Sequence, residues 1–189
     1  MKRLFSIICV FVLFLVSCQK QNVEMVLKPT KEIPNEILTY YKDYSSPVSY
    51  NFIVNETNID YELIQYELVN NEWTNRISFF GSRLKNSKGS FAFIPDCKPE
   101  HMAITTIDGS IENGYRAFGT GHNNDNSLYQ YIELNEEVNI SYDKEIPILF
   151  QIKSDNKISL TFNSNTNELT NQLKDYEEVY LITVKFTKN

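Results

Sequence analysis

The sequence predicts an all-β protein, an antiparallel two-sheet β-sandwich of about 8–11 strands with at most one or two short helices. After Pro47, apolar residues recur at every second position, which is the period of a half-buried strand. Clusters of Asn, Asp, Gly and Ser interrupt this pattern roughly every 8–12 residues, as turns do between short strands. The loops between these segments vary in length, which favours a sandwich over a closed barrel.

The first half of the alternating region contains the clearest predicted hairpin. A first strand is expected where Tyr50, Phe52 and Val54 alternate. The segments Tyr61–Val69 and Trp73–Phe80 follow, separated by Asn70-Asn71-Glu72, and such a short amide-rich connection is typical of a tight turn between antiparallel strands. Further strands are expected around Phe91 and Phe93, at Met102–Ile107 and at Tyr115–Gly119.

The pattern in the second half of the alternating region predicts strands at Leu128–Leu134, Val138–Tyr142, Ile146–Lys153, Lys157–Asn163 and Val179–Phe186. Within the third of these, Ile146, Ile148, Phe150 and Ile152 alternate strictly. Pro147 lies on the opposite face and favours an edge strand or a strand start, because proline has no N–H to donate. The last segment is apolar on both faces, as expected of a central strand.

Two segments have a helical pattern. Glu168–Tyr176 is expected to form one or two helical turns. Pro34–Tyr44 has Ile37, Leu38 and Tyr41 at helical spacing, with proline at a permitted first-turn position, so it predicts either a weak amphipathic helix or an extended lead-in.

The N-terminus has the pattern of an export signal. Leu4–Val16 is apolar, follows Lys2 and Arg3, and is shorter than the roughly 20 residues that span a bilayer as a helix. It ends in Leu15-Val16-Ser17-Cys18, which resembles the lipobox of bacterial lipoproteins. The resemblance implies signal-peptidase recognition of Leu15, Val16 and Ser17, cleavage before Cys18, and a diacylglycerol on the Cys18 sulfur that holds the chain on the extracytoplasmic face of the cell membrane. The alternatives are an ordinary signal peptide with a chance cysteine and an uncleaved anchor.

These features predict three parts: a removed signal peptide at residues 1–17, a lipidated N-terminus and tether at 18–33, and a single β-sandwich domain at 34–189. The tether shows no sustained period, and about 15 flexible residues span roughly 20 Å root-mean-square. The many Asn, Lys and Ile residues resemble those of Firmicutes surface lipoproteins, although a Gram-negative origin stays open.

Charge and cysteine content limit the partners. The whole chain has a net charge of −6, and no basic cluster follows the signal peptide, so nucleic acid is not an expected partner. An acidic domain is not attracted to anionic headgroups, so membrane attachment is expected from the lipid alone. Of the three cysteines, Cys9 is removed and Cys18 is lipidated. Cys97 then has no partner for an internal disulfide.

No motif predicts catalysis, a cofactor or a metal. Cys97 and His101 lie beside Asp96 and Glu100, but a structural zinc site needs four ligands and a nucleophilic pair needs an orienting third group. The loop Gly119–Ser127 lacks the third glycine of a phosphate-binding motif, and also the closing glutamate of a calcium loop, so calcium is only an alternative to a solvated turn. The chain is therefore expected not to be an enzyme.

The twelve tyrosines provide the remaining signal. If Leu128, Ile132 and Leu134 point inward, then Tyr129 and Tyr131 point outward beside the loop that contains His122, with Tyr115 on the preceding strand. We expect these four residues to form a binding surface for another envelope protein, a small ligand or a sugar. The alternative is that other parts of the fold cover them. The expected function is a non-catalytic binding or accessory module, with a carbohydrate-binding module or weak surface hydrolase as its rival.

Overall fold

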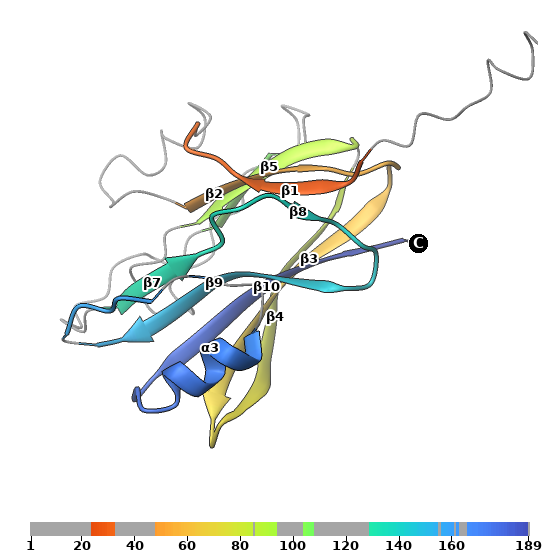
Figure 1. Cartoon of the computed structure of the whole chain (residues 1–189). Helices are drawn as coiled ribbons and strands as arrows, with labels where there is room; N and C mark the ends of the chain where they lie inside the picture. Colours follow the sequence, from red (N-terminus) through yellow and green to blue (C-terminus); the bar gives the residue numbers. More distant parts are fainter. Residues whose placement is uncertain are drawn as a thin grey trace, which may run out of the picture.

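A computed structural model of the chain shows two antiparallel sheets that pack against each other (Figure 1). It describes residues 24–32, 48–84, 86–93, 104–107, 129–154, 156–160, 162 and 166–188. Within these residues the regular structure consists of strands and one helix, α3 (Thr166–Leu173). The predicted all-β class and two-sheet sandwich are therefore confirmed.

Each sheet has five strands. The first sheet has the order β6 (Ile104–Ile107), β5 (Lys88–Phe93), β2 (Val48–Ile53), β1 (Val26–Pro29) and β8 (Val138–Asn139). The second sheet has the order β4 (Glu72–Leu84), β3 (Ile59–Val69), β10 (Val179–Thr187), β9 (Glu145–Lys153) and β7 (Tyr129–Glu133). Both sheets combine strands from distant parts of the sequence.

The predicted hairpin is formed by β3 and β4, whose pairing runs from Val69 and Glu72 at the turn to Ile59 and Leu84. Asn70 and Asn71 both adopt left-handed backbone conformations, with φ of 53° and 66°. Positive φ at both central residues characterises the type I′ turn, in which asparagine is well tolerated. The amide-rich turn in the sequence therefore has a direct structural reason.

The last strand, β10, lies in the centre of the second sheet, as the sequence predicted. It pairs with β3 on one side and with β9 on the other. Its side chains are buried on both faces over most of its length; Ile182 is 0% exposed on one face and Thr183 is 3% exposed on the other.

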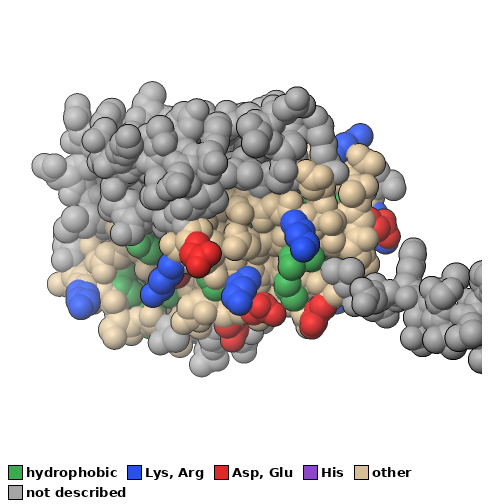
Figure 2. Space-filling view, turned by 90° about the horizontal axis from the view of Figure 1, so that it is seen from above, with side chains coloured by type: hydrophobic (Ala, Val, Ile, Leu, Met, Phe, Trp, Pro, Cys, Tyr) green, Lys and Arg blue, Asp and Glu red, His purple; other side chains and the backbone are tan. Residues whose placement is uncertain are grey.

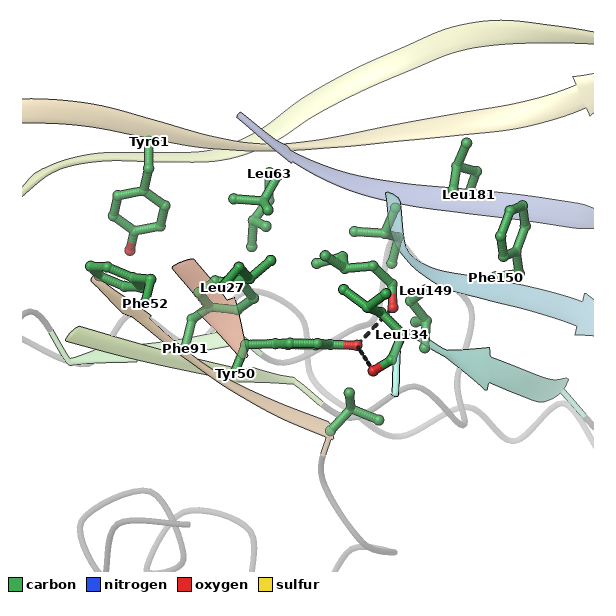
Figure 3. Packing of buried hydrophobic residues seen from close by; sticks show 14 of the residues in the cluster. Leu27, Tyr50, Phe52, Tyr61, Leu63, Phe91, Leu134, Leu149, Phe150 and Leu181 are labelled. Carbon is green, nitrogen blue, oxygen red and sulfur yellow. Dashed lines mark hydrogen bonds between the residues drawn. The ribbon is translucent and has the colours of Figure 1, made fainter. Parts of the chain in front are cut away.

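Aromatic rings fill the space between the two sheets (Figure 3). The Phe52 ring of the first sheet lies 6.0 Å from that of Tyr61 and 5.5 Å from that of Phe186, both in the second sheet. The Tyr50 hydroxyl donates a hydrogen bond to the Ile148 backbone oxygen across the core, at 2.7 Å. This bond satisfies the one polar atom of the Tyr50 side chain, so that the ring packs in the core without an uncompensated hydroxyl.

The opposite face of the second sheet is covered by α3. Trp73 in β4 donates a hydrogen bond from Nε1 to Thr170 Oγ1 at 2.8 Å, and its ring lies 5.9 Å from that of Phe150. Phe150 pairs with Leu181, and odd-numbered residues of β10 face away from Phe186 and the first sheet. The helix therefore adds a partial third layer, which explains why β10 is buried on both faces. Residues 168–173 of α3 were predicted to be helical, and the helix ends three residues before the end of the predicted segment.

The start of the domain differs from the expectation. Val26–Pro29, predicted as part of the tether, is strand β1, and it pairs with both β2 and β8. Leu27 is 0% exposed. The ordered domain therefore begins before residue 34, and the tether prediction is wrong for this segment. Met25 and Leu27 alternate with the same period as the later strands. A strand of four residues that ends in a proline is too short to be distinguished from a linker by this pattern.

Two predictions about the region around β9 also need correction. The register of β9 shifts so that Leu149 pairs with Ile182 and Pro147 with Thr183, which leaves Ile148 as an extra residue in a β-bulge. The predicted strict alternation is therefore interrupted, and Ile148, Leu149 and Phe150 are all buried. The segment Lys157–Asn163 was predicted to be a strand, but 157–160 and 162 have no strand structure.

Pro147 itself fits its prediction. The pairing of β7 with β9 ends at Leu149, so Pro147 lies where β9 pairs with β10 alone. A proline at such a position removes no ladder hydrogen bond on the unpaired side.

Candidate functional site

The face of the second sheet that packs on the first sheet changes its chemistry along its length. Near the first sheet it presents apolar side chains such as Tyr61 and Phe186. Directly opposed residues of antiparallel strands share a face, and the register places polar residues farther along this same face. We define the tyrosine–amide patch as Gln65, Tyr129, Tyr131, Gln151, Lys153, Glu178 and Tyr180.

The patch has a regular geometry across three strands. Tyr180 of β10 pairs with Gln151 of β9, and Gln151 pairs with Tyr131 of β7. One position farther along the same face, Lys153 pairs with Tyr129. One row therefore alternates phenol, amide and phenol, and the next pairs an ammonium group with a phenol.

The carboxylate of Glu178 is the centre of the patch's hydrogen bonds. Its Oε2 accepts hydrogen bonds from the hydroxyls of Tyr129 at 2.6 Å and Tyr180 at 3.1 Å. Its Oε1 accepts one from Lys153 Nζ at 2.7 Å. Lys153 also lies 3.7 Å from Oε2 of Glu177. These contacts tie β7, β9 and the start of β10 together.

The same contacts set the charge of the patch. Burial alone raises the pKa of Glu178, but the hydrogen bonds from Lys153, Tyr129 and Tyr180 outweigh it and lower the pKa to about 2. Glu178 is therefore ionised near neutral pH. Its charge is balanced by the Lys153 ammonium, so the pair brings no net charge to the patch. A carboxyl that stays ionised in this way is unsuited to act as a general acid.

The two glutamines are deeply buried. Gln65 is 2% exposed and Gln151 is 0% exposed. Burial of an amide in the interior is unfavourable unless hydrogen bonds compensate it, so such residues usually have a specific structural or binding role. Gln130 provides a contrast, because its amide lies on the other face of β7. There it donates to the backbone oxygens of Ser154 and Asn156 and accepts from the Ile158 N–H, which holds the segment after β9.

The structure brings two of the predicted binding residues together and corrects the environment of one. Tyr129 and Tyr131 share a face of β7, opposite to Ile132, as predicted. Tyr131 is 38% exposed, but Tyr129 is only 7% exposed and its ring lies 6.5 Å from that of Tyr180. The predicted exposure of Tyr129 is wrong because its ring packs beside Tyr180 and its hydroxyl is bonded to Glu178.

Sequence reasoning missed Gln65, Gln151, Lys153, Glu178 and Tyr180. The signal that was present is the interruption of apolar strands by glutamine at Gln65 and Gln151, where a core position would be aliphatic. Tyr115 and His122 lie outside the described residues, as do Cys97, His101, the loop Gly119–Ser127 and the motif Leu15–Cys18.

A second polar cluster lies on the opposite face of the sheet. The Tyr66 hydroxyl hydrogen-bonds to Glu145 at 2.8 Å, and Thr183 Oγ1 donates to Glu145 Oε2 at 2.8 Å. Burial, together with the hydrogen bond to Glu145, raises the pKa of Tyr66 to about 12. These groups bond to one another on adjacent strands, which is the arrangement of cross-strand pairs that stabilise a sheet.

Neither a metal centre nor a membrane helix is found in the described part of the chain. There, no group of three or more His, Cys, Asp or Glu side chains is arranged to hold a metal ion. None of its helices is long and apolar enough to cross a membrane.

Together, the two sheets and the tyrosine–amide patch define an all-β sandwich domain with a polar, aromatic region inside one sheet face. A model of the YgaN domain family matches residues 49–186, from β2 into β10, and the chain therefore belongs to the YgaN domain family. Strand β1 precedes the matched range. Comparison with curated proteins and with solved structures found no match.

Proposed function

We propose that this protein is a lipid-anchored extracytoplasmic lipoprotein that acts as a non-catalytic binding or accessory module at the cell envelope. The N-terminal sequence supports the anchor, since an apolar segment too short to span a bilayer ends in Leu15-Val16-Ser17-Cys18. Two or more acyl chains on Cys18 anchor a protein stably, whereas a single chain binds only marginally.

The observation that carries the binding proposal is the tyrosine–amide patch. Tyr131 is one of two large hydrophobic side chains of the described residues that are exposed, and it borders a group of side chains fixed by hydrogen bonds. Tyrosine provides a rigid, amphipathic contact and is enriched among residues that dominate binding energy. Fixed neighbours reduce the entropy lost when a partner binds. The partner is another envelope protein or a small ligand.

A carbohydrate is the second candidate ligand, because phenol and amide groups hydrogen-bond to sugar hydroxyls. The buried ring of Tyr129 weighs against an open row of stacking aromatics, and the ion-paired Glu178 is not itself available as the protonated general acid of a hydrolase. We therefore rank the binding module above a carbohydrate-binding module or surface hydrolase.

Lipidation is tested by Cys18→Ser with metabolic palmitate labelling. The wild-type chain is expected to incorporate label and the serine variant to incorporate none, because the thiol is the acceptor. Cys97→Ser is the matched control and should label as the wild type does. Label that persists in the Cys18→Ser variant contradicts the assignment.

Binding at Tyr131 is tested by a photo-crosslinking amino acid at this position in intact cells. Val69, which is 42% exposed at the end of β3, is the matched control position. A discrete adduct at 131 that is missing at 69 supports the patch, and its sensitivity to protease or glycosidase separates a protein partner from a glycan. Identical adducts at both positions, or none at 131, contradict the proposal.

A further inference from the structure

The position of β1 shortens the connection between the proposed lipid and the folded domain. Met25 is already part of the structure, because its backbone oxygen accepts a hydrogen bond from the Ile140 N–H at 2.8 Å. Whatever its path, the chain from Cys18 to Met25 reaches about 25 Å at most. A flexible chain of this length has a root-mean-square span of about 15 Å.

The chain enters the domain at a definite end. Tyr142, which follows Ile140 by two residues, donates a hydrogen bond from its hydroxyl to the Asn55 side chain at 2.6 Å. The Asp143 N–H donates to the Phe186 backbone oxygen at 2.8 Å. Figure 1 shows the start of β1 and the end of β10 on the same side of the molecule. We call this the anchor-side end and define it by Met25, Asn55, Glu56, Tyr142, Asp143 and Lys188.

The tyrosine–amide patch and the β3–β4 turn lie away from this end. Strand β3 starts there and has 11 residues, so its far end lies about 35 Å away. The patch lies along the same direction, since Phe186 of β10 is close to the anchor-side end and Tyr180 is six residues farther along the strand. The far end of the sheet is thus more distant than the connection can reach.

The charges at the anchor-side end are compatible with a membrane surface. Lys188 forms an ion pair with Glu56 and lies 4.7 Å from the centre of the Tyr142 ring, and Arg83 pairs with Asp60 at 2.9 Å. Figure 2 shows another face, the one seen from above Figure 1, and there too the described basic and acidic side chains are interspersed. At the anchor-side end the Lys188 and Arg83 cations offset the Glu56 and Asp60 carboxylates, so these pairs add no net negative charge for anionic headgroups to repel.

We propose that the lipidated protein holds its anchor-side end against the phospholipid headgroup layer, so that the tyrosine–amide patch and the β3–β4 turn face away from the membrane. This orientation rests on the lipidation of Cys18 proposed above. It follows from the short connection and the entry point of β1, and it turns Tyr131, the exposed side chain of the patch, toward partners beyond the headgroups.

The orientation is tested with a fluorophore on single cysteines in a Cys97→Ser background, where the acylated Cys18 is blocked. Thr57→Cys places the label in the exposed turn of the anchor-side end, and Val69→Cys places it beside the β3–β4 turn. The full lipidated protein, purified from membranes, is reconstituted into phosphatidylglycerol and phosphatidylethanolamine vesicles that contain a headgroup-quencher lipid. Quenching is expected to be several-fold stronger at residue 57 than at residue 69.

Insertion of a ten-residue Gly-Ser segment after Gln21 provides the control for the connection, because it should reduce quenching at residue 57. Mass spectrometry of the same samples reports the acyl group. An acylated protein with equal quenching at both positions, or with quenching unaffected by the insertion, overturns the orientation alone. A purified protein without the acyl group overturns the proposed anchor, and with it the orientation.

Discussion

The two halves of one face of the second sheet are built on the same strands but are held together differently. Around Tyr61 and Phe186, ring packing against the first sheet dominates, with centroid separations of 6.2 Å between these two rings and 5.5 Å from Phe186 to Phe52. Around Tyr129 and Glu178, hydrogen bonds to a carboxylate dominate. Alternation along a strand therefore identifies a face, whereas the chemistry of that face changes with position along the strand.

The apolar half should be the more sensitive to truncation. Phe186 is 0% exposed, and Phe186→Ala is expected to lower the free energy of unfolding by about 3–5 kcal/mol, because it removes buried ring surface and leaves a cavity. Urea unfolding followed by circular dichroism measures this change. A loss below about 1 kcal/mol would mean that the sheets do not pack through these rings.

In the polar half, Tyr129→Phe separates the hydroxyl from the ring. The substitution removes a 2.6 Å hydrogen bond to Glu178 while it keeps the ring against Tyr180, so we expect a loss of about 1.5–3 kcal/mol in the free energy of unfolding. Tyr180→Phe removes the longer 3.1 Å bond and serves as the matched comparison, with a smaller loss. Equal stability of wild type and Tyr129→Phe would show that the carboxylate contributes nothing to this half.

Acid should weaken the polar half first. The pKa of Glu178 is lowered to about 2 in the folded state from an ordinary value of 4.5, so the ionised carboxylate contributes its full stabilisation above about pH 4.5. This contribution is lost as the pH falls from about 4.5 toward 2. Glu178→Gln should therefore flatten the decline in stability across this range, as measured by urea midpoints at several pH values. An unchanged acid dependence in the variant would contradict the role of Glu178.

The smallest effect is expected at the exposed edge of the patch. Tyr131 is 38% exposed, so Tyr131→Ala should change the free energy of unfolding by no more than about 0.5 kcal/mol. The same urea titrations provide the measurement. A loss of several kcal/mol would place Tyr131 in the core and remove it from the candidate binding surface.

The fold could be predicted from the sequence more completely than the candidate site, because the patterns that predict strands and turns are local. The period of two, the Asn70-Asn71 turn and the two-sided apolar pattern of residues 179–186 are local properties. The turn and the last strand were predicted correctly, whereas the period of two also predicted a strand at 157–163 that residues 157–160 and 162 do not form. The bulge at Ile148 depends on the register between two strands that are distant in sequence, so local alternation does not reveal it.

The site depends even more on non-local structure. The sequence identified Tyr129 and Tyr131 as sharing one face, but the burial of Tyr129 depends on how the sheet packs. Glu178 follows α3 and precedes β10, and it meets Lys153 and Tyr129 only after three strands have assembled. No spacing in the sequence relates these three residues.

The place of β10 also determines the order in which the protein can fold during synthesis. Because β10 separates β3 from β9, the second sheet cannot be assembled before residues 179–187 have left the ribosome. Pairings between distant parts of a chain also form slowly. A premature stop codon shortly before residue 179 would remove the middle of the sheet rather than its border, so it would be expected to abolish the whole fold.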